Sequence, residues 1–389
     1  MTVTTSRFNV VDIDAHYLEP VAELTDYMPD PWKTVIKAGG SSAFIPRNIG
    51  DLSMGGRIRR EDLPIFTDSR TVHGGESGGD SVRATHQHLG LDASILISNW
   101  VISLSGTSQR DIAVAYYNAY IDYMLERVVD ADRGIYTVPV LSWQEPEASA
   151  ALIDRVAGHP GVVGVCLSTS GANPPLGDER YNAIYAAAER NDLPVILHGN
   201  SGLLLRSDGG YADGLQRLIE AHCLGFSISN LTQLTSVMLR GTPERFPKLK
   251  FVFMEAGLFW VPMAMYRMDE YFLKRRSEAP LLRALPSEYI KDRFYFGTQP
   301  LESPKDPSHL QAVMEMIGYE HILFASDYPH FDFDHPSAIV KLPFLKPGQK
   351  AAVLGGNAIR VFNLDRHGRP AWMRTPEAPA TAGVSAPPP

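Results

Sequence analysis

Short apolar segments that alternate with amphipathic helical patterns are the feature that most restricts how this chain can fold. Eight segments are rich in Val, Ile, Leu or Phe, which is typical of strands buried on both faces of a sheet. Alternating strands and helices indicate a parallel sheet, and eight repeats predict a closed (β/α)8 barrel of the TIM type, an α/β fold. The predicted strands are residues 8–16, 93–98, 134–139, 162–168, 194–198, 250–255, 293–297 and 322–327.

The spacing of these segments predicts one barrel with an insertion after the first strand. Helical patterns lie at residues 109–129, 147–157, 180–191 and 307–317. Residues 1–370 form the expected barrel, and residues 30–90 form the insertion, with a stretch rich in Gly, Ser and Arg at 39–79. Two interpretations stay open for this stretch: a lid over the barrel mouth, or a partly disordered surface loop. Residues 371–389 are rich in Pro and Ala and predict a disordered tail.

Composition excludes several classes of partner. The formal net charge of −8 argues against nucleic acid as a ligand. No segment approaches the ~20 apolar residues of a membrane span, so we expect no membrane association. Two cysteines cannot form a disulfide framework, and a cytoplasmic location is expected. We expect a small-molecule substrate and a homo-oligomer.

The first strand ends in a cluster of polar side chains. Asp12, Asp14 and His16 share one face because side chains alternate along a strand. Such groups are costly in an apolar strand unless they are paired or bound to a metal ion. Glu19 follows three residues later and could return toward the same place.

Three more strands end in a carboxylate or an imidazole. His198 ends the fifth strand, Glu255 the sixth and Asp327 the eighth, and His330 follows Asp327 by three residues. Because the carboxyl ends of barrel strands meet at one mouth, these groups predict a metal site there. His222, in the next connection, is a further ligand, a proton shuttle or a core histidine.

The types of ligand restrict the metal. Imidazole with carboxylate suits zinc, iron or manganese, and the absence of thiolates argues against a structural zinc site. Three carboxylates with two histidines favour a binuclear site over a lone zinc ion, an inference from ligand count alone.

These residues carry a family resemblance over about residues 8–365. The chain resembles the amidohydrolase-related family that includes aminocarboxymuconate-semialdehyde decarboxylase and the aromatic-acid decarboxylases. The resemblance implies a metal-dependent barrel with His16, His198 and Asp327 at ligand positions. The family often has histidine or glutamate where this chain has Asp14, and histidine, as acid–base catalyst, where it has Glu255. The motifs are Val11-Asp12-Ile13-Asp14-Ala15-His16 with Glu19-Pro20, Leu197-His198-Gly199-Asn200, Arg245-Phe246-Pro247-Lys248-Leu249-Lys250 and Ala325-Ser326-Asp327-Tyr328-Pro329-His330.

The carboxylate at position 255 leads to our first functional hypothesis. The chain is similar to a branch of this fold that serves as non-heme diiron monooxygenases in natural-product pathways. This resemblance implies two irons, an electron donor and hydroxylation of a bulky apolar, terpenoid-like small molecule. The expected iron ligands are Asp14, His16, His198, Glu255 and Asp327, with His222 as a possible sixth.

Two alternatives remain. The first is a decarboxylase or hydrolase with one zinc or manganese, acting on a carboxylated or acyl small molecule. There Asp327 is the general base, and His330 or His222 replaces the missing histidine. The second is a non-catalytic barrel that binds a ligand or partner.

Overall fold

The computed structural model describes residues 8–39, 53–54, 57–58, 78–200, 215 and 217–374. Most of the predicted insertion and the tail from residue 375 onward lie outside the described residues, so the lid and the disordered tail stay predictions. Within the described part of the chain, no helix combines the length and the apolar character needed to cross a membrane. The expected homo-oligomer also stays a prediction.

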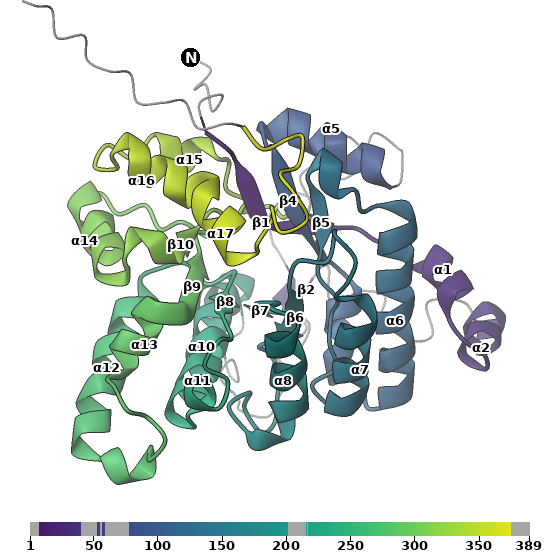
Figure 1. Ribbon diagram of the computed structural model, residues 1–389, viewed down its shortest axis with the longest axis horizontal. Helices are drawn as coiled ribbons and strands as arrows, with labels where there is room; N and C mark the ends of the chain where they lie inside the picture. Colours follow the sequence, from purple (N-terminus) through teal and green to yellow (C-terminus); the bar gives the residue numbers. More distant parts are fainter. Residues whose placement is uncertain are drawn as a thin grey trace, which may run out of the picture.

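The predicted barrel is confirmed. Eight parallel strands run through the middle of the described structure, with helices outside them (Figure 1). Each strand overlaps a predicted segment; β1 ends one residue later than predicted, and several others are shorter than predicted. The strands are β1 (Val11–Tyr17), β4 (Ala93–Ser98), β5 (Ile135–Thr137), β6 (Val165–Ser168), β7 (Val195–His198), β8 (Phe251–Phe253), β9 (Phe294–Gly297) and β10 (Ile322–Leu323).

Backbone hydrogen bonds close the barrel at the two places where regular pairing stops. The regular ladders form two sheets, ordered β1-β4-β5 and β10-β9-β8-β7-β6. Between β5 and β6, the Cys166 N–H donates to the Pro139 carbonyl at 2.9 Å. Between β1 and the segment after β10, the His16 N–H donates to the Tyr328 carbonyl at 2.9 Å. The strands therefore form one closed circle.

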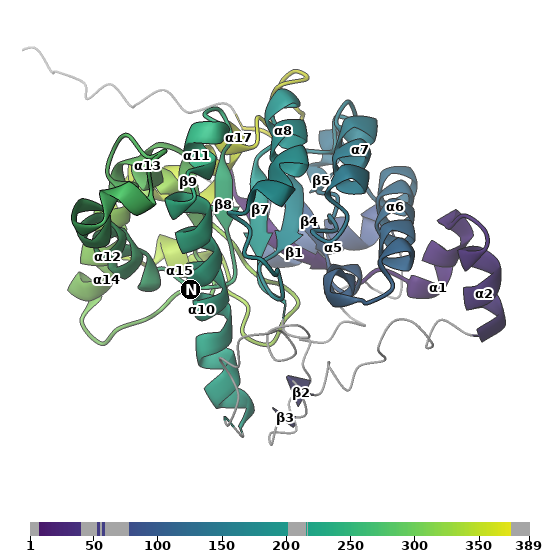
Figure 2. The same cartoon turned by 90° about the horizontal axis from the view of Figure 1, so that it is seen from below.

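Helices cover the outside of this circle, as apolar strands buried on both faces require. Figure 2 shows α10 extending past the barrel toward the small antiparallel pair β2 (Ser53–Met54) and β3 (Arg57–Ile58). The helices are α1 (Val21–Leu24), α2 (Trp32–Gly39), α5 (Gly79–Leu89), α6 (Arg110–Arg127), α7 (Pro146–Val156), α8 (Asn182–Arg190), α10 (Leu218–Leu239), α11 (Thr242–Arg245), α12 (Trp260–Lys274), α13 (Pro286–Arg293), α14 (Pro307–Ile317), α15 (Ser337–Val340), α16 (Pro347–Ala351) and α17 (Asn357–Val361). Short 3-10 turns include η3 (Val101–Gly106).

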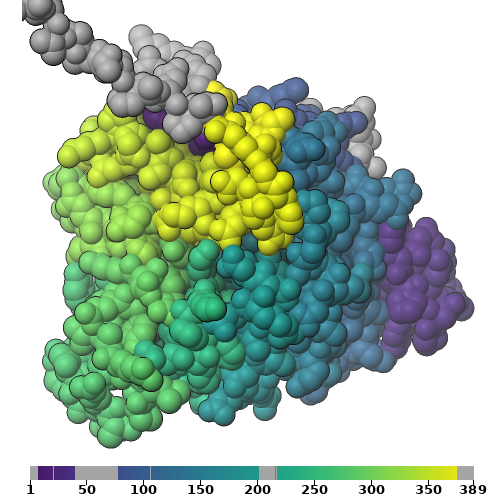
Figure 3. Space-filling model, viewed as in Figure 1, coloured from purple at the N-terminus to yellow at the C-terminus, as the bar shows by residue number. Residues whose placement is uncertain are grey.

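The last described residues cover the amino ends of the strands. Figure 3 shows them in yellow, between residues drawn in light green and residues drawn in blue. The Trp372 indole N–H lies 3.1 Å from the Tyr136 hydroxyl, and Arg374 pairs with Asp92 at 2.8 Å. Since this end of the barrel is covered, the strand-end residues at the opposite, carboxyl end form the mouth.

Candidate metal centre and active site

The ends of β1 and β7 bring the first three predicted ligands together. His198 Nε2 lies 3.2 Å from Asp14 Oδ1, and His16 Nε2 lies 3.6 Å from the same oxygen. All three side chains are buried. Their nitrogen and oxygen atoms lie within 4.8 Å of one another, close enough to share one ion.

The segment after β10 supplies a second group that shares His16. Asp327 Oδ1 lies 3.0 Å from His16 Nε2 and 2.7 Å from His330 Nδ1. The His330 and His16 rings face each other with centroids 4.2 Å apart. His16 thus stands between the two groups, so the predicted convergence of Asp14, His16, His198 and Asp327 on one mouth is observed.

Two of the strand-end carboxylates have an unusual backbone. Glu255 has φ 56° and Asp327 has φ 61°, both in the left-handed region that few residues other than glycine adopt. The strained turn at Asp327 is held by its own N–H, which donates to the Asp14 carbonyl at 2.8 Å. Strained residues at a strand end cluster at functional sites, and here both carry buried carboxylates.

The charges in the mouth are unevenly balanced. Burial alone would raise the pKa of Asp327, but His330 and His16 outweigh it and hold that pKa below its usual value. Burial would lower the pKa of His198, but Asp14 beside it raises that pKa above its usual value. Burial, together with the charges of Asp327, Asp14 and Asp332, raises the pKa of Glu255 well above its usual value.

Several atoms in the mouth fit a metal ion better than they fit one another. His198 Nδ1 lies 2.5 Å from the Gly199 carbonyl and donates to it, which leaves Nε2, 3.2 Å from Asp14 Oδ1, as the ring nitrogen that can bind a metal ion. Asp14 Oδ2 and His16 Nδ1 are buried and have no hydrogen-bond partner. A cation bound among these donors would balance the charge of the buried carboxylates, and imidazole with carboxylate suits zinc, manganese or iron.

Two predicted ligands lie at the margin of this cluster. Glu255 Oε2 is 3.4 Å from His198 Nδ1, but Glu255 is absent from both groups of mutually close donor atoms among the described residues. His222, on α10, has its Nε2 3.8 Å from Asp332 Oδ2, and its ring packs against Phe226 and Phe331. Neither geometry brings these two residues into the ligand groups.

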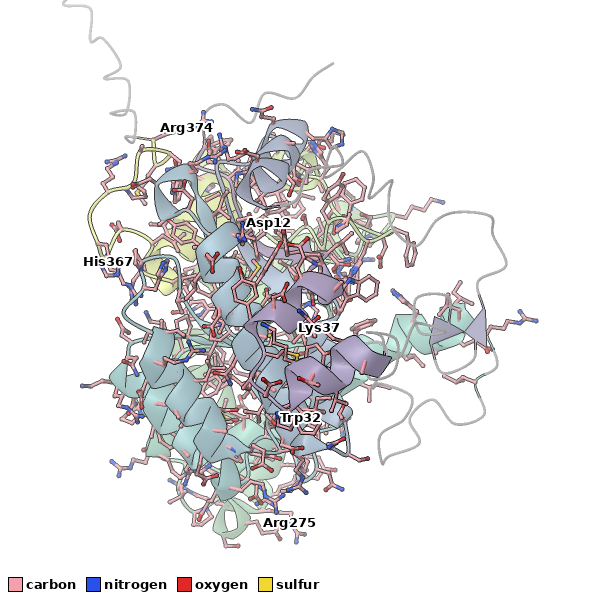
Figure 4. All side chains as sticks on the ribbon, turned by 90° about the vertical axis from the view of Figure 1, so that its right-hand side faces the viewer. Asp12, Trp32, Lys37, Arg275, His367 and Arg374 are labelled. Atoms are coloured by element: carbon pink, nitrogen blue, oxygen red, sulfur yellow. The ribbon has the colours of Figure 1, made fainter. Side chains whose placement is uncertain are left out.

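Asp12 and Glu19 serve the backbone rather than the mouth. The pairing of β1 with β4 shifts between Asp12 and Ala15, so strict alternation fails there. Figure 4 places Asp12 inside the molecule, where its carboxylate accepts from the Ser326 N–H at 2.8 Å. Burial raises the pKa of Asp12 to about 7 despite this bond. The Glu19 carboxylate accepts four hydrogen bonds from Ser98 to Val101 and does not return to the metal cluster.

Sequence reasoning missed three residues of the mouth. Asn99 Oδ1 lies 3.0 Å from His330 Nε2, and Gln299 Nε2 donates to Asp327 Oδ2 at 3.2 Å. Asp332 lies beside His222. Asn99 directly follows β4 and Gln299 lies two residues after β9, so a search for amides at strand ends would have found both.

The family follows from a comparison with known proteins. The amidohydrolase family model matches residues 91–364. This chain belongs to the amidohydrolase family. Within it, the chain is similar to a gamma-resorcylate decarboxylase of Polaromonas sp. (strain JS666), with 24% identity over 253 residues, which are 63% of this chain and 75% of the relative.

Solved structures share the amidohydrolase fold. The 5-carboxyvanillate decarboxylase of Sphingomonas paucimobilis has a TM-score of 0.65 and 21% identity, covering 92% of this chain and 99% of that one. The dihydroxybenzoic acid decarboxylase of Polaromonas sp. JS666, solved with manganese and the inhibitor 2-nitroresorcinol, has a TM-score of 0.60 and 17% identity, covering 92% and 98%.

These comparisons overturn the first functional hypothesis. The expected diiron monooxygenase is wrong, because the matching relatives are decarboxylases, as in the alternative interpretation. The preference for an oxidoreductase is wrong for the same reason. Two irons are not supported either, since the metal seen in a solved relative is manganese. What stands is a site suited to a divalent metal in an amidohydrolase barrel.

Proposed function

We propose that this amidohydrolase is a metal-dependent decarboxylase of a small hydroxylated aromatic acid. The observation that carries the proposal is the convergence of Asp14, His16, His198 and Asp327 at the mouth, with His330 on Asp327. The names of the similar proteins support the substrate class, because they act on gamma-resorcylate, 5-carboxyvanillate and dihydroxybenzoic acid.

Decarboxylation needs a positive charge that binds the anionic substrate and a proton that replaces the carboxylate on the ring. In decarboxylation the bond between the ring and the carboxylate breaks, carbon dioxide leaves, and a proton takes its place on the ring carbon. The step is redox-neutral, so the electron donor expected for an oxygenase has no part in it. A divalent metal, when bound, supplies the positive charge that attracts the oxygens of an anionic substrate.

The chain's own residues divide the remaining work. Asp14, His16, His198 and Asp327 would hold the metal through the donor atoms that converge in the mouth. His330, bonded to Asp327 through Nδ1 and partly exposed, is placed to hold the proton at the edge of the site. Glu255 stands where the resembling decarboxylases have a catalytic histidine, and we assign it to proton transfer at the ring carbon.

The test is a metal-resolved assay without oxygen. The apo-protein is loaded with manganese, zinc or ferrous iron under argon and incubated with 2,6-dihydroxybenzoate, 5-carboxyvanillate and close hydroxybenzoates. We expect release of carbon dioxide with one of the divalent metals, with a decarboxylated phenol as product. No carbon dioxide from any acid, with full metal occupancy shown by elemental analysis, would reject the proposal. Turnover that requires dioxygen would reject it as well.

A further inference from the structure

His330 is tied at both ring nitrogens to opposite sides of β1. Its Nδ1 lies 2.7 Å from Asp327 Oδ1, and its Nε2 lies 3.0 Å from Asn99 Oδ1. Asp327 follows β10 and Asn99 follows β4, and β1 lies between these two strands in the barrel. The ring therefore spans the end of β1, where it lies against the ring of His16.

The turn that carries Asn99 is itself fixed by a buried carboxylate. Glu19 accepts hydrogen bonds from the Asn99 N–H at 3.0 Å, the Trp100 N–H at 2.9 Å and the Val101 N–H at 2.8 Å. The Ser98 hydroxyl donates to the same carboxylate at 2.5 Å. These N–H groups lie at the start of η3, where a carboxylate stabilises the unpaired donors of a helical turn.

We propose that Asn99 is a positioning residue for His330, and that Glu19 acts through Asn99 by fixing its turn. Asn99 accepts a hydrogen bond from the Nε2–H of His330, so the ring is held in one rotation with Nδ1 on Asp327. The role of this position in turnover rests on the proposed function. The hydrogen bond does not, and it can be observed directly.

Two substitutions of Asn99 should have different effects on the His330 ring. Asn99→Ala removes the acceptor for the Nε2–H, while the bond between Nδ1 and Asp327 stays. Asn99→Asp keeps an oxygen of the same reach and therefore keeps the ring in place. If the amide of Asn99 instead donated to the ring, Asn99→Asp would fail as badly as Asn99→Ala. The matched control is Asn118→Ala, which removes an amide that bonds to the Val114 carbonyl on α6, away from the mouth.

The experiment combines imidazole NMR with kinetics. The full chain is labelled with ¹⁵N-histidine and loaded with zinc, and the Nε2–H signal of His330 is assigned by its loss in His330→Gln. We expect this signal to be protected from exchange in the wild type, Asn118→Ala and Asn99→Asp, and absent in Asn99→Ala. We expect Glu19→Gln, which removes the charge that fixes the turn, to weaken the protection without removing the signal.

Turnover separates the positioning role from a purely structural one. With manganese, Asn99→Ala should lose about 10-fold in kcat with KM nearly unchanged, and Asn99→Asp should recover most of it. A protected signal or an unchanged kcat in Asn99→Ala would overturn the proposal. If the wild type turns over no acid, the proposed function fails, while the NMR result still decides whether Asn99 holds the ring.

Discussion

Glu255 and Asp327 occupy matching places in two parts of the barrel mouth. Each carboxylate follows a short strand, β8 or β10, and each has a left-handed backbone with φ near 60°. Both side chains are buried. The same local geometry therefore directs a carboxylate from each side of the mouth toward His198 or His16.

The partners of the two carboxylates differ. Asp327 has His330 at 2.7 Å, His16 at 3.0 Å and Gln299 at 3.2 Å, and its pKa lies below the usual value. Glu255 has His198 at 3.4 Å beside three other carboxylates, and its pKa lies well above the usual value. A similar backbone conformation thus places the two carboxylates in different surroundings: those of Asp327 favour the charged form that our proposed metal ligand needs, and those of Glu255 favour the protonated form that our proposed proton carrier needs.

Removal of the charge at Asp327 should have the largest effect. Asp327→Asn keeps the shape but takes an anionic donor from the ligand cluster, so we expect at least about 100-fold weaker manganese binding and about 10³-fold less activity. Manganese content after dialysis measures the first effect and carbon dioxide release the second.

The matched control for this variant is Asp192→Asn. Asp192 also has a left-handed backbone, with φ 51°, but it pairs with Asn363 and lies outside the ligand groups. It should bind manganese as the wild type does. Normal manganese content in Asp327→Asn would remove Asp327 from the metal site.

Substitution of Glu255, unlike that of Asp327, should lower activity without loss of manganese. Glu255→Gln removes the proton carrier but no member of the ligand groups, so activity should fall about 10²-fold while manganese content is kept. Glu255→His introduces an imidazole that titrates near neutral pH and tolerates a left-handed backbone, so it should be at least about 10-fold more active than Glu255→Gln. Loss of manganese from Glu255→Gln would instead make Glu255 a ligand.

Substitution of Gln299 removes a hydrogen bond to Asp327 and leaves the charge of Asp327 unchanged. Gln299→Met keeps the volume but loses the donor to Asp327 Oδ2, so manganese binding should weaken about 10-fold. Gln233→Met is the control, because Gln233 is also buried but bonds to the backbone of Thr169 and Leu176. Equal manganese affinities, measured by calorimetry, would show that Gln299 does not support Asp327.

The barrel and the convergence of polar side chains at its mouth were predictable because both rest on short-range patterns. An apolar run that ends in Asp327 or His198 marks a strand end by itself, and barrel topology then brings those ends together. The roles of Asp12 and Glu19 were not predictable in this way. Their partners, Ser326 and the turn after Ser98, are distant in sequence, and strand alternation gives no information about them.

The error in function came from a single residue. Glu255 in place of histidine suggested a second metal, because a count of carboxylates ignores which donor atoms are close together. In the structure Glu255 lies outside both ligand groups, and the relatives are decarboxylases. Asn99 and Gln299 were not predicted, because only charged and imidazole groups at strand ends served as candidate site residues.

His86 is a buried histidine that lies outside the two ligand groups of the mouth. His86 lies on α5, and its Nδ1 is 3.1 Å from the Arg83 guanidinium, which can only donate. Nδ1 is therefore the acceptor, and Nε2 donates to the Ser94 hydroxyl at 2.8 Å. Burial, with the charges of Arg83 and Arg133, lowers the pKa of His86 to about 3.

The lowered pKa of His86 predicts the smallest of these effects, a change in the pH dependence of the free energy of unfolding. The unfolded chain takes up the proton near pH 6.5 and the folded chain only near pH 3, so the unfolded state binds more protons between these values. Stability should therefore be full above pH 6.5 and fall by up to about 1.4 kcal/mol per pH unit below it. His86→Gln can keep both hydrogen bonds without titrating. The free energy of unfolding, measured with urea, should therefore decrease less between pH 7 and pH 5 in His86→Gln than in the wild type. An equal decrease in both proteins would show that His86 is not the group that titrates.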